Sequence, residues 1–331
     1  MLDIVALPKA ELHLHLEGAI PPSCLLALLR KYQVPDCQDL QALRARLVYR
    51  DFGHFLDTWR WMTGYVRSYE DFRWIAEAVA RSLADQGIQY AEVFFSPPDF
   101  FQHGLSITGI ALAIRSGLER AAVPVRVRLI CDLCRQHPPE RAAAWLEEIA
   151  AVRADADIVG VGLGGPEHLF PPEPFARVYR RAAELGLHRV VHAGEAAGPG
   201  SIRGALDALG AERIGHGTRA VEDAELVRRL VSERIPLEVC LTSNVCTGVV
   251  ERLEAHPVRQ LFDAGVRITL ASDDPTFFGV NLVEEYGNLR TLGFSDDELI
   301  QIARAGFESA FLSDTERAPW LSAIAAKTAP G

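Results

Sequence analysis

Several features that would mark a particular class of protein are scarce in this sequence. No stretch approaches the roughly 18 to 20 consecutive apolar residues that a membrane-spanning helix requires. The formal net charge is −10, so the chain offers no basic field for the phosphates of nucleic acid or for an anionic membrane surface. We therefore expect neither nucleic acid nor a membrane as a partner.

Lysine is also scarce, because only Lys9, Lys31 and Lys327 occur and arginine carries nearly all of the positive charge. The six cysteines belong to a chain that is too long to need disulfide staples, and the N-terminus MLDIVALPKA lacks the apolar core of a signal peptide. A cytoplasmic location is the expectation. Linkers, low-complexity tracts and internal repeats are lacking too, so we expect residues 1–331 to form a single domain.

Short β-rich runs alternate with longer amphipathic segments along the whole chain, a pattern typical of βαβ units and a parallel sheet. The helical patterns lie at 73–85, 107–121, 140–152, 174–185, 223–233 and 258–264. The strand-like runs lie at 11–17, 88–95, 125–131, 158–163, 189–193, 213–217, 237–241 and 267–271. Eight strands with intervening helices predict an α/β fold of the TIM type, a closed (β/α)₈ barrel.

The gap between the first two runs is unusually long and predicts extra helices inserted after the first strand, at 20–87. Within it Phe52, Phe55, Trp59 and Met62 recur at helical spacing. We interpret most of these as a packed helix face. Because the insertion leaves a barrel strand at its C-terminal end, a few of the aromatic rings can still cover the barrel mouth, where an active site would lie.

Histidines and carboxylates gather at the C-terminal ends of four predicted strands, the rim on which TIM barrels mount functional groups. Alternate residues of a strand share one face, so His13 and His15 can both point into the barrel and bind one ion. The other members of the set are His192 and Glu195 at the fifth strand, His216 at the sixth, and Asp273 and Asp274 at the eighth.

Three imidazoles and one carboxylate suit a catalytic zinc with a position left for water, and iron, cobalt or nickel could occupy the same ligands. Many barrel hydrolases hold two metals bridged by a modified lysine. Here no lysine lies between Lys31 and Lys327, so we expect one metal, Zn²⁺, per chain. Such a zinc would lower the pKa of its water ligand to about 7 and supply the nucleophile of a hydrolase.

Proton transfer would then need general acid and base groups. Glu195 follows a ligand by three residues and is well sited as an acid. His216 and Asp274 could take the proton from the attacking water and orient it. Each of these residues taken alone could equally be a solvated carboxylate or a buried structural histidine.

Five segments, read together, resemble the adenosine deaminase family. They are PKAELHLHLEG (8–18), HAGE (192–195), RIGHG (213–217), TSNV (242–245) and ASDDP (271–275). The resemblance implies that His13, His15, His192 and Asp273 bind zinc. It also implies that Glu195 protonates the purine ring at N1, that His216 and Asp274 handle the water that attacks C6, and that the backbone N–H of Gly165 meets purine N3.

The segments depart from the family pattern where they would meet the sugar. Glu17 stands where adenosine deaminases usually have an aspartate that meets the ribose 5′-hydroxyl, and LGGPE (163–167) and VFFSP (93–97) differ as well. We expect a small-molecule partner, a 6-aminopurine nucleoside, with aminodeoxyfutalosine as an alternative. Adenine deaminases usually have aspartate in place of Gly215, so that residue favours a nucleoside. A hydrolase that does not deaminate and an inactive nucleoside-binding barrel are further alternatives.

Overall fold

The structure is a computed structural model that describes residues 2–35, 37–50 and 52–328, without the side chains of residues 52 and 328. None of the helices in these ranges has the length and apolar character needed to cross a bilayer. Eight parallel strands pair in sequence order, each with the next. They are β1 (Lys9–His15), β2 (Ile88–Phe95), β3 (Arg126–Asp132), β4 (Ile158–Gly162), β5 (His188–Ala193), β6 (Arg213–His216), β7 (Leu237–Val239) and β8 (Ile268–Leu270).

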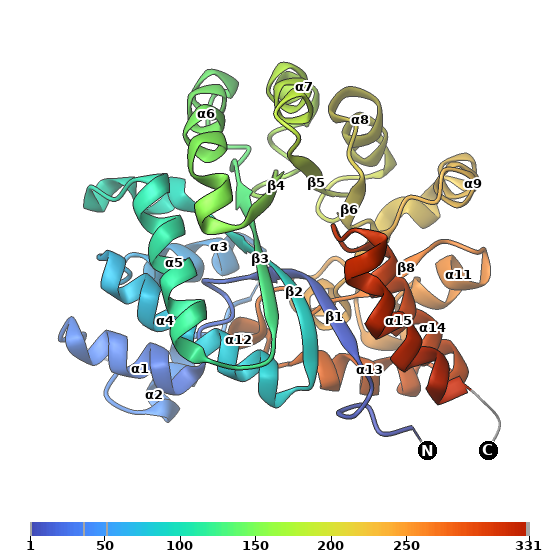
Figure 1. Cartoon of the computed structure of the whole chain (residues 1–331), viewed down its shortest axis with the longest axis horizontal. Helices are drawn as coiled ribbons and strands as arrows, with labels where there is room; N and C mark the ends of the chain where they lie inside the picture. The colour runs from blue at the N-terminus through green and yellow to red at the C-terminus, as the bar shows by residue number, and fades with distance from the viewer. Residues whose placement is uncertain (1, 36, 51, 329–331) are drawn as a thin grey trace.

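Helices surround this barrel (Figure 1). The insertion between β1 and β2 consists of α1 (Pro22–Lys31), α2 (Leu40–Arg46), α3 (Phe52–Thr63) and α4 (Tyr69–Asp85). Later come α5 (Ile107–Ala121), α6 (Pro139–Ala156), α7 (Ala176–Glu184), α8 (Pro199–Leu209), α9 (Ala224–Ser232), α10 (Leu241–Cys246) and α11 (Val258–Asp263). After β8 follow α12 (Pro275–Phe278), α13 (Leu282–Thr291), α14 (Asp296–Ser309) and α15 (Asp314–Thr328). Short 3₁₀ segments are η1 (Pro97–His103), η2 (Glu173–Phe175), η3 (Thr218–Glu222) and η4 (Leu253–Ala255).

The predicted TIM-type barrel is thus confirmed, and strand β2 has the predicted bounds. The first strand is shifted from its prediction, because it begins at Lys9 and ends at His15. After His15 the chain turns, and the Ala19 N–H donates to the His15 carbonyl at 2.9 Å. Glu17 therefore lies in the turn and not in the strand.

Local signals explain where several helices begin. Ser68 and Ser295 each form a capping box at the start of α4 and α14, and Asp223 accepts two backbone N–H bonds at the start of α9. A side-chain oxygen at this position satisfies donors that have no partner inside the helix. These caps fix the helix starts, and the apolar face of each helix packs on the barrel.

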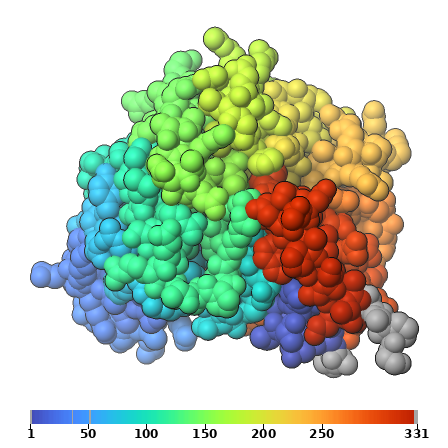
Figure 2. Space-filling model, viewed as in Figure 1, coloured from blue at the N-terminus to red at the C-terminus, as the bar shows by residue number. Residues whose placement is uncertain are grey.

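The barrel is closed between β8 and β1 by two backbone bonds just beyond the end of β8. Asp273 N–H donates to the His13 carbonyl, and the His15 N–H donates to the Asp273 carbonyl, each at 3.0 Å. The C-terminal helices lie beside this seam: they are red and adjoin the blue N-terminal segment in the space-filling view (Figure 2). Inside the barrel, Phe94, Ile130 and Val190 form a separate, fully buried apolar cluster.

Candidate active site

The strand ends bring the four predicted metal ligands together, although the chain separates them by up to 260 residues (273 − 13). His13 and His15 point from β1, and His192 from β5, toward the same point. Asp273 joins them because it forms the backbone seam that closes the barrel against β1. The ring of Phe94 lies beneath them, with its centroid 4.9 Å from that of His13. The barrel closure itself therefore assembles this cluster.

The ligand atoms of these four residues converge closely enough to hold one ion. One ligand atom from each lies within 4.8 Å of all the others. Nε2 of His15 and Nε2 of His192 are 3.1 Å apart, and Asp273 Oδ1 is 3.3 Å from Nε2 of His15 and 3.5 Å from Nε2 of His13. His13 Nε2 is buried and makes no hydrogen bond within the described part of the chain. Such lone pairs fit a divalent transition metal.

Neighbouring side chains orient two of these ligands. His13 Nδ1 lies 2.7 Å from Glu238 Oε2, so that nitrogen carries the proton and the lone pair of Nε2 faces the cluster. The Ser243 hydroxyl donates to Asp273 Oδ2 at 2.7 Å, which leaves Oδ1 for the cluster. Glu238 comes from β7 and Ser243 from α10, so a fourth segment of the chain supports the candidate metal site.

Residues at the site adopt backbone conformations that are unfavourable for side chains. His216 and Asp273 both have φ of 61°, and Cys134, at the edge of the same pocket, has φ of 49°. Left-handed backbone outside glycine costs about 1 to 3 kcal/mol and occurs most often at functional sites. The fold maintains this strain where the side chains of His216 and Asp273 must face the cavity.

The three predicted catalytic residues line the same pocket as three of the ligands, His15, His192 and Asp273. Burial, and then the negative charge of Asp273, raises the pKa of both Glu195 and Asp274 well above the ordinary range of a carboxyl group. Burial lowers the pKa of His216 to about 3, so this imidazole is neutral. His216 Nε2 is 3.7 Å from Glu195 Oε2. The pocket therefore contains proton donors and acceptors beside a candidate metal site.

Glu167, in the loop after β4, holds the loop that carries Glu195. Its carboxylate accepts the backbone N–H groups of Gly194, Glu195 and Ala197, at distances of 2.6, 3.1 and 2.9 Å. Arg135 braces the same region by donating to the carbonyls of Leu163 and His192. Two buried charges thus fix the position of the loop between β5 and α8.

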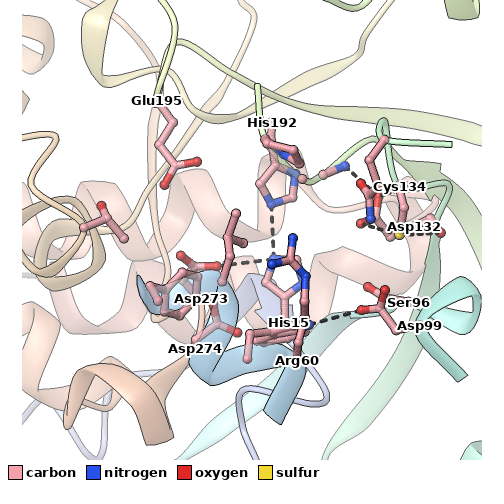
Figure 3. A pocket seen from close by; sticks show the side chains of 18 of the residues that line it. His15, Arg60, Ser96, Asp99, Asp132, Cys134, His192, Glu195, Asp273 and Asp274 are labelled. Carbon is pink, nitrogen blue, oxygen red and sulfur yellow. Dashed lines mark hydrogen bonds and ion pairs between the residues drawn. The ribbon is translucent and has the colours of Figure 1, made fainter. Parts of the chain in front are cut away.

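The rest of the pocket extends away from the ligand cluster toward a polar mouth (Figure 3). Glu195, His192, His15, Asp273 and Asp274 lie at one side, whereas Asp132, Cys134, Ser96 and Asp99 lie at the other. Phe55 and Trp59 of α3 line it as well, so two of the three aromatic residues predicted at helical spacing cover the mouth. Met62 is packed and fully buried. The side chain of Phe52 lies outside the described residues.

Besides Asp274, two residues were predicted to contact the substrate, Gly165 and Glu17, and only Gly165 lines the pocket. Gly165 lines the pocket with φ of +101°, a conformation that favours glycine, and a Cβ there would meet the Gln136 side chain at 2.5 Å. Glu17 is buried: its Oε1 accepts the Ser96 N–H at 2.9 Å, and Ser96 lines the pocket. Burial raises the pKa of Glu17 to about 7. Glu17 thus reaches the pocket through the backbone of Ser96.

Sequence reasoning gave no role to Glu167, Glu238 or Asn244. Glu238 had a usable signal, because a charged residue stands in the middle of the apolar run LEVCL (237–241). Asn244 lies in a segment that carries the family resemblance and Glu167 in one that departs from the family pattern, but nothing local identifies the groups that they contact. Their partners come from other strand ends and appear only in three dimensions.

Known proteins resemble this chain over almost its entire length. A sequence model described as adenosine deaminase matches residues 8–327. An adenine deaminase from Streptomyces coelicolor is 39% identical, with 99% of this chain and 97% of the relative covered. An aminodeoxyfutalosine deaminase from the same organism is 36% identical, with 96% and 87% covered.

A solved amidohydrolase from Burkholderia ambifaria, with bound zinc, has a TM-score of 0.90 and 29% identity, with 98% of this chain and 91% of that chain covered. The enzymes named among these relatives deaminate adenine-type compounds. The preference for a nucleoside over adenine stays a prediction, since relatives of both kinds are similar to this chain. The chain belongs to the adenosine deaminase family and is a deaminating hydrolase of adenine-type substrates.

Proposed function

We propose that this enzyme removes, by hydrolysis, the exocyclic amino group of a 6-aminopurine nucleoside that carries no phosphate, using one zinc ion. The observation that carries the proposal is the convergence of four ligand atoms within 4.8 Å of one another beside Glu195 and Asp274. His13, His15, His192 and Asp273 would hold the zinc. When bound, the metal supplies a water ligand whose pKa is lowered to about 7. The zinc in the Burkholderia ambifaria relative supports this choice of metal.

The protein side chains would then move the protons. Glu195, kept protonated by burial, donates to N1 of the purine as water adds to C6 and the ring loses its aromaticity. Asp274, whose carboxyl group a cation bound by the neighbouring ligands would keep ionised, accepts a proton from the attacking water and passes it to the amino group. The C6–N bond breaks and ammonia leaves. The hydroxyl on C6 then gives up its remaining proton, which restores the proton that Glu195 gave to N1, and the oxygen from water remains on C6 as a carbonyl. The N–H of Gly165 would meet purine N3.

The pocket's mouth supports a substrate that extends beyond the purine. Asp99 and Asp132 line the side away from the ligand cluster, where carboxylates can accept hydrogen bonds from sugar hydroxyls. Arg60 also lines the mouth, but it is paired with Asp57 at 2.9 Å. Two carboxylates and one paired arginine disfavour a phosphate, so we propose a nucleoside and not a nucleotide.

Gly215 supports the same choice. A Cβ on Gly215 would lie 2.7 Å from His13 Cε1, closer than real Cβ contacts. An aspartate in this place, expected of adenine deaminases, would therefore require His13 to move. Adenine is the second candidate substrate, because the relative with 39% identity is named an adenine deaminase.

Loss of the adenine chromophore on adenosine, deoxyadenosine, adenine and aminodeoxyfutalosine tests the proposal. Zinc-loaded protein should turn over at least one of the three nucleosides with a kcat/KM at least tenfold that for adenine. A higher value for adenine would establish the second candidate instead. Turnover of none of the four by zinc-loaded protein would contradict the proposed reaction.

A further inference from the structure

Behind His216 lies a buried chain of polar groups that the proposed reaction does not use. This series of hydrogen bonds links a backbone N–H on α11 to the His216 ring through His256 and Asn244. His216 Nδ1 is 3.2 Å from Asn244 Nδ2, and Asn244 Oδ1 is 3.1 Å from His256 Nε2. Asn244 is fully buried and His256 is 5% exposed, so water does not compete for these bonds.

The direction of each hydrogen bond in this series follows from the Val258 N–H, at the end away from His216. The Val258 backbone N–H donates to His256 Nδ1 at 3.1 Å, and a backbone N–H has no alternative role. His256 Nδ1 is therefore an acceptor, so the ring proton of His256 is on Nε2 and is donated to Asn244 Oδ1. The Thr218 hydroxyl, which can donate or accept, then donates to the same Oδ1 at 2.7 Å.

The amide in turn fixes the tautomer of His216. With Oδ1 accepting from two donors, Nδ2 of Asn244 is the atom that faces His216, and it can only donate. His216 Nδ1 must then carry a lone pair. This excludes both the imidazolium and the tautomer protonated at Nδ1, and it leaves the ring proton on Nε2, which faces Glu195 and the pocket.

We propose that Asn244, oriented by His256 and Thr218, is a positioning residue that makes His216 a hydrogen-bond donor to the attacking water and prevents it from acting as that water's base. The inference rests on the proposed function for the identity of the attacked substrate. It assigns removal of the water proton to Asp274 alone. His216 then holds the oxygen of the water in place through its Nε2–H and stabilises the negative charge that develops there.

Nitrogen NMR of zinc-loaded protein labelled with ¹⁵N-histidine tests the tautomer without any substrate. The chain has ten histidines, and a His216→Gln variant identifies the His216 signals by their loss. We expect a protonated Nε2 and an unprotonated Nδ1. Protonation at Nδ1 in the wild type would overturn the inference, whatever substrate the enzyme proves to use.

Asn244→Asp tests the consequence, because aspartate keeps the two incoming donors and replaces only the amide donor by an acceptor. The proton of neutral His216 should move to Nδ1, and kcat should fall about 10²-fold, the typical effect of losing one oriented donor, with KM changed little. If His216 were the base, a carboxylate behind it would hold or raise kcat, and that result would overturn the proposal. Both measurements use a pH at which the spectrum shows neutral His216.

Further variants separate positioning from structural damage. Asn281→Asp is the matched control, because Asn281 caps α13 without lining the site pocket and aspartate caps a helix equally well. It should leave kcat and the His216 signals unchanged. At position 256, His256→Gln keeps an N–H donor for Asn244 and should retain more activity than His256→Phe. Equal activity of the two, with an unaltered His216 signal, would contradict the role of His256.

Discussion

The two ends of the barrel differ in how completely their buried charged and polar groups are hydrogen-bonded. At the N-terminal end, Arg213 donates to Glu238 at 2.6 Å, to Glu92 at 2.5 Å and to the Ser309 carbonyl at 3.0 Å. Lys9 there donates to the carbonyls of Ile4 and Leu7 at 2.6 and 2.9 Å. Each buried cation is surrounded by acceptors, so its desolvation is offset by direct bonds.

At the C-terminal end the buried groups remain incompletely bonded. His13 Nε2, His192 Nδ1 and Asp274 Oδ1 are buried without hydrogen-bond partners in the described structure. Unpaired buried polar atoms destabilise a folded chain, so this end is arranged for binding and reaction. Glu238 connects the two ends, because it accepts from Arg213 with one oxygen and from His13 with the other.

The largest effect is expected at the C-terminal end, for Glu195→Gln. Glutamine matches the shape of the protonated carboxyl but cannot give up a proton, so kcat should fall about 10³-fold. The metal content and the free energy of unfolding should not decrease. Steady-state kinetics, elemental analysis and denaturant titration measure the three quantities. Unchanged ammonia release would refute the role of Glu195 as the acid.

At the N-terminal end we expect a loss of stability, whereas Glu195→Gln loses activity, and the variant that tests it is Arg213→Met. This change leaves Glu92 and Glu238 buried without their shared cation, and the free energy of unfolding should drop by about 3 kcal/mol. Denaturant titration measures it. Arg181→Met is the matched control, since Arg181 pairs with Glu147 on the surface and its loss should change the free energy of unfolding far less. Equal costs for the two variants would remove the contrast between buried and exposed pairs.

A smaller effect is expected for Glu167→Gln. The amide group cannot accept all three backbone N–H bonds that now hold the Glu195 loop, so the acid should be displaced and kcat should fall about tenfold. Metal content should stay the same because Glu167 bonds to the backbone of Gly194, Glu195 and Ala197 and to none of the four predicted metal ligands. Exposed Glu225→Gln serves as the control for the change of charge. An unaltered kcat in Glu167→Gln would show that the loop holds its shape without this carboxylate.

The smallest effect is expected at the mouth, for Trp59→Phe. Trp59 donates to Asp99 at 3.1 Å and stacks on Phe277, and phenylalanine retains only the ring contact. Loss of one hydrogen bond beside the nucleoside should raise KM about fivefold, with a minor change in kcat. Trp61→Phe on the same helix is the control, because Trp61 contacts Tyr65 instead. A larger change in kcat than in KM would place Trp59 at the reacting atoms.

The strand pattern predicted the barrel and the polar residues at its mouth for a physical reason, and the family resemblance selected the four metal ligands among them. Strands buried on both faces have apolar runs such as that of β2, and the ends of parallel strands meet at one rim. Any polar residue just beyond such a run, such as His192 or Asp273, is therefore placed at the mouth. The strand periodicity of two places His13 and His15 on one face without any knowledge of the fold.

Other features could not be predicted, because they depend on contacts between distant segments. Glu167 contacts backbone groups of another loop, and the direction of the Asn244 amide depends on His256 and on the Val258 N–H. The turn after His15 moved Glu17 out of the first strand, and no local pattern indicated that its carboxylate would bond to Ser96. The helices after β8 carry no functional motif, and we did not predict their positions.

The metal content of the purified enzyme tests the central claim most directly. Elemental analysis should find one equivalent of a divalent transition metal per chain in the wild type. His192→Ala and Asp273→Asn should each lose it, while Arg181→Met, on the surface, should retain it. No stoichiometric metal in the wild type, or full retention in both ligand variants, would contradict the claim that these four side chains form a metal site.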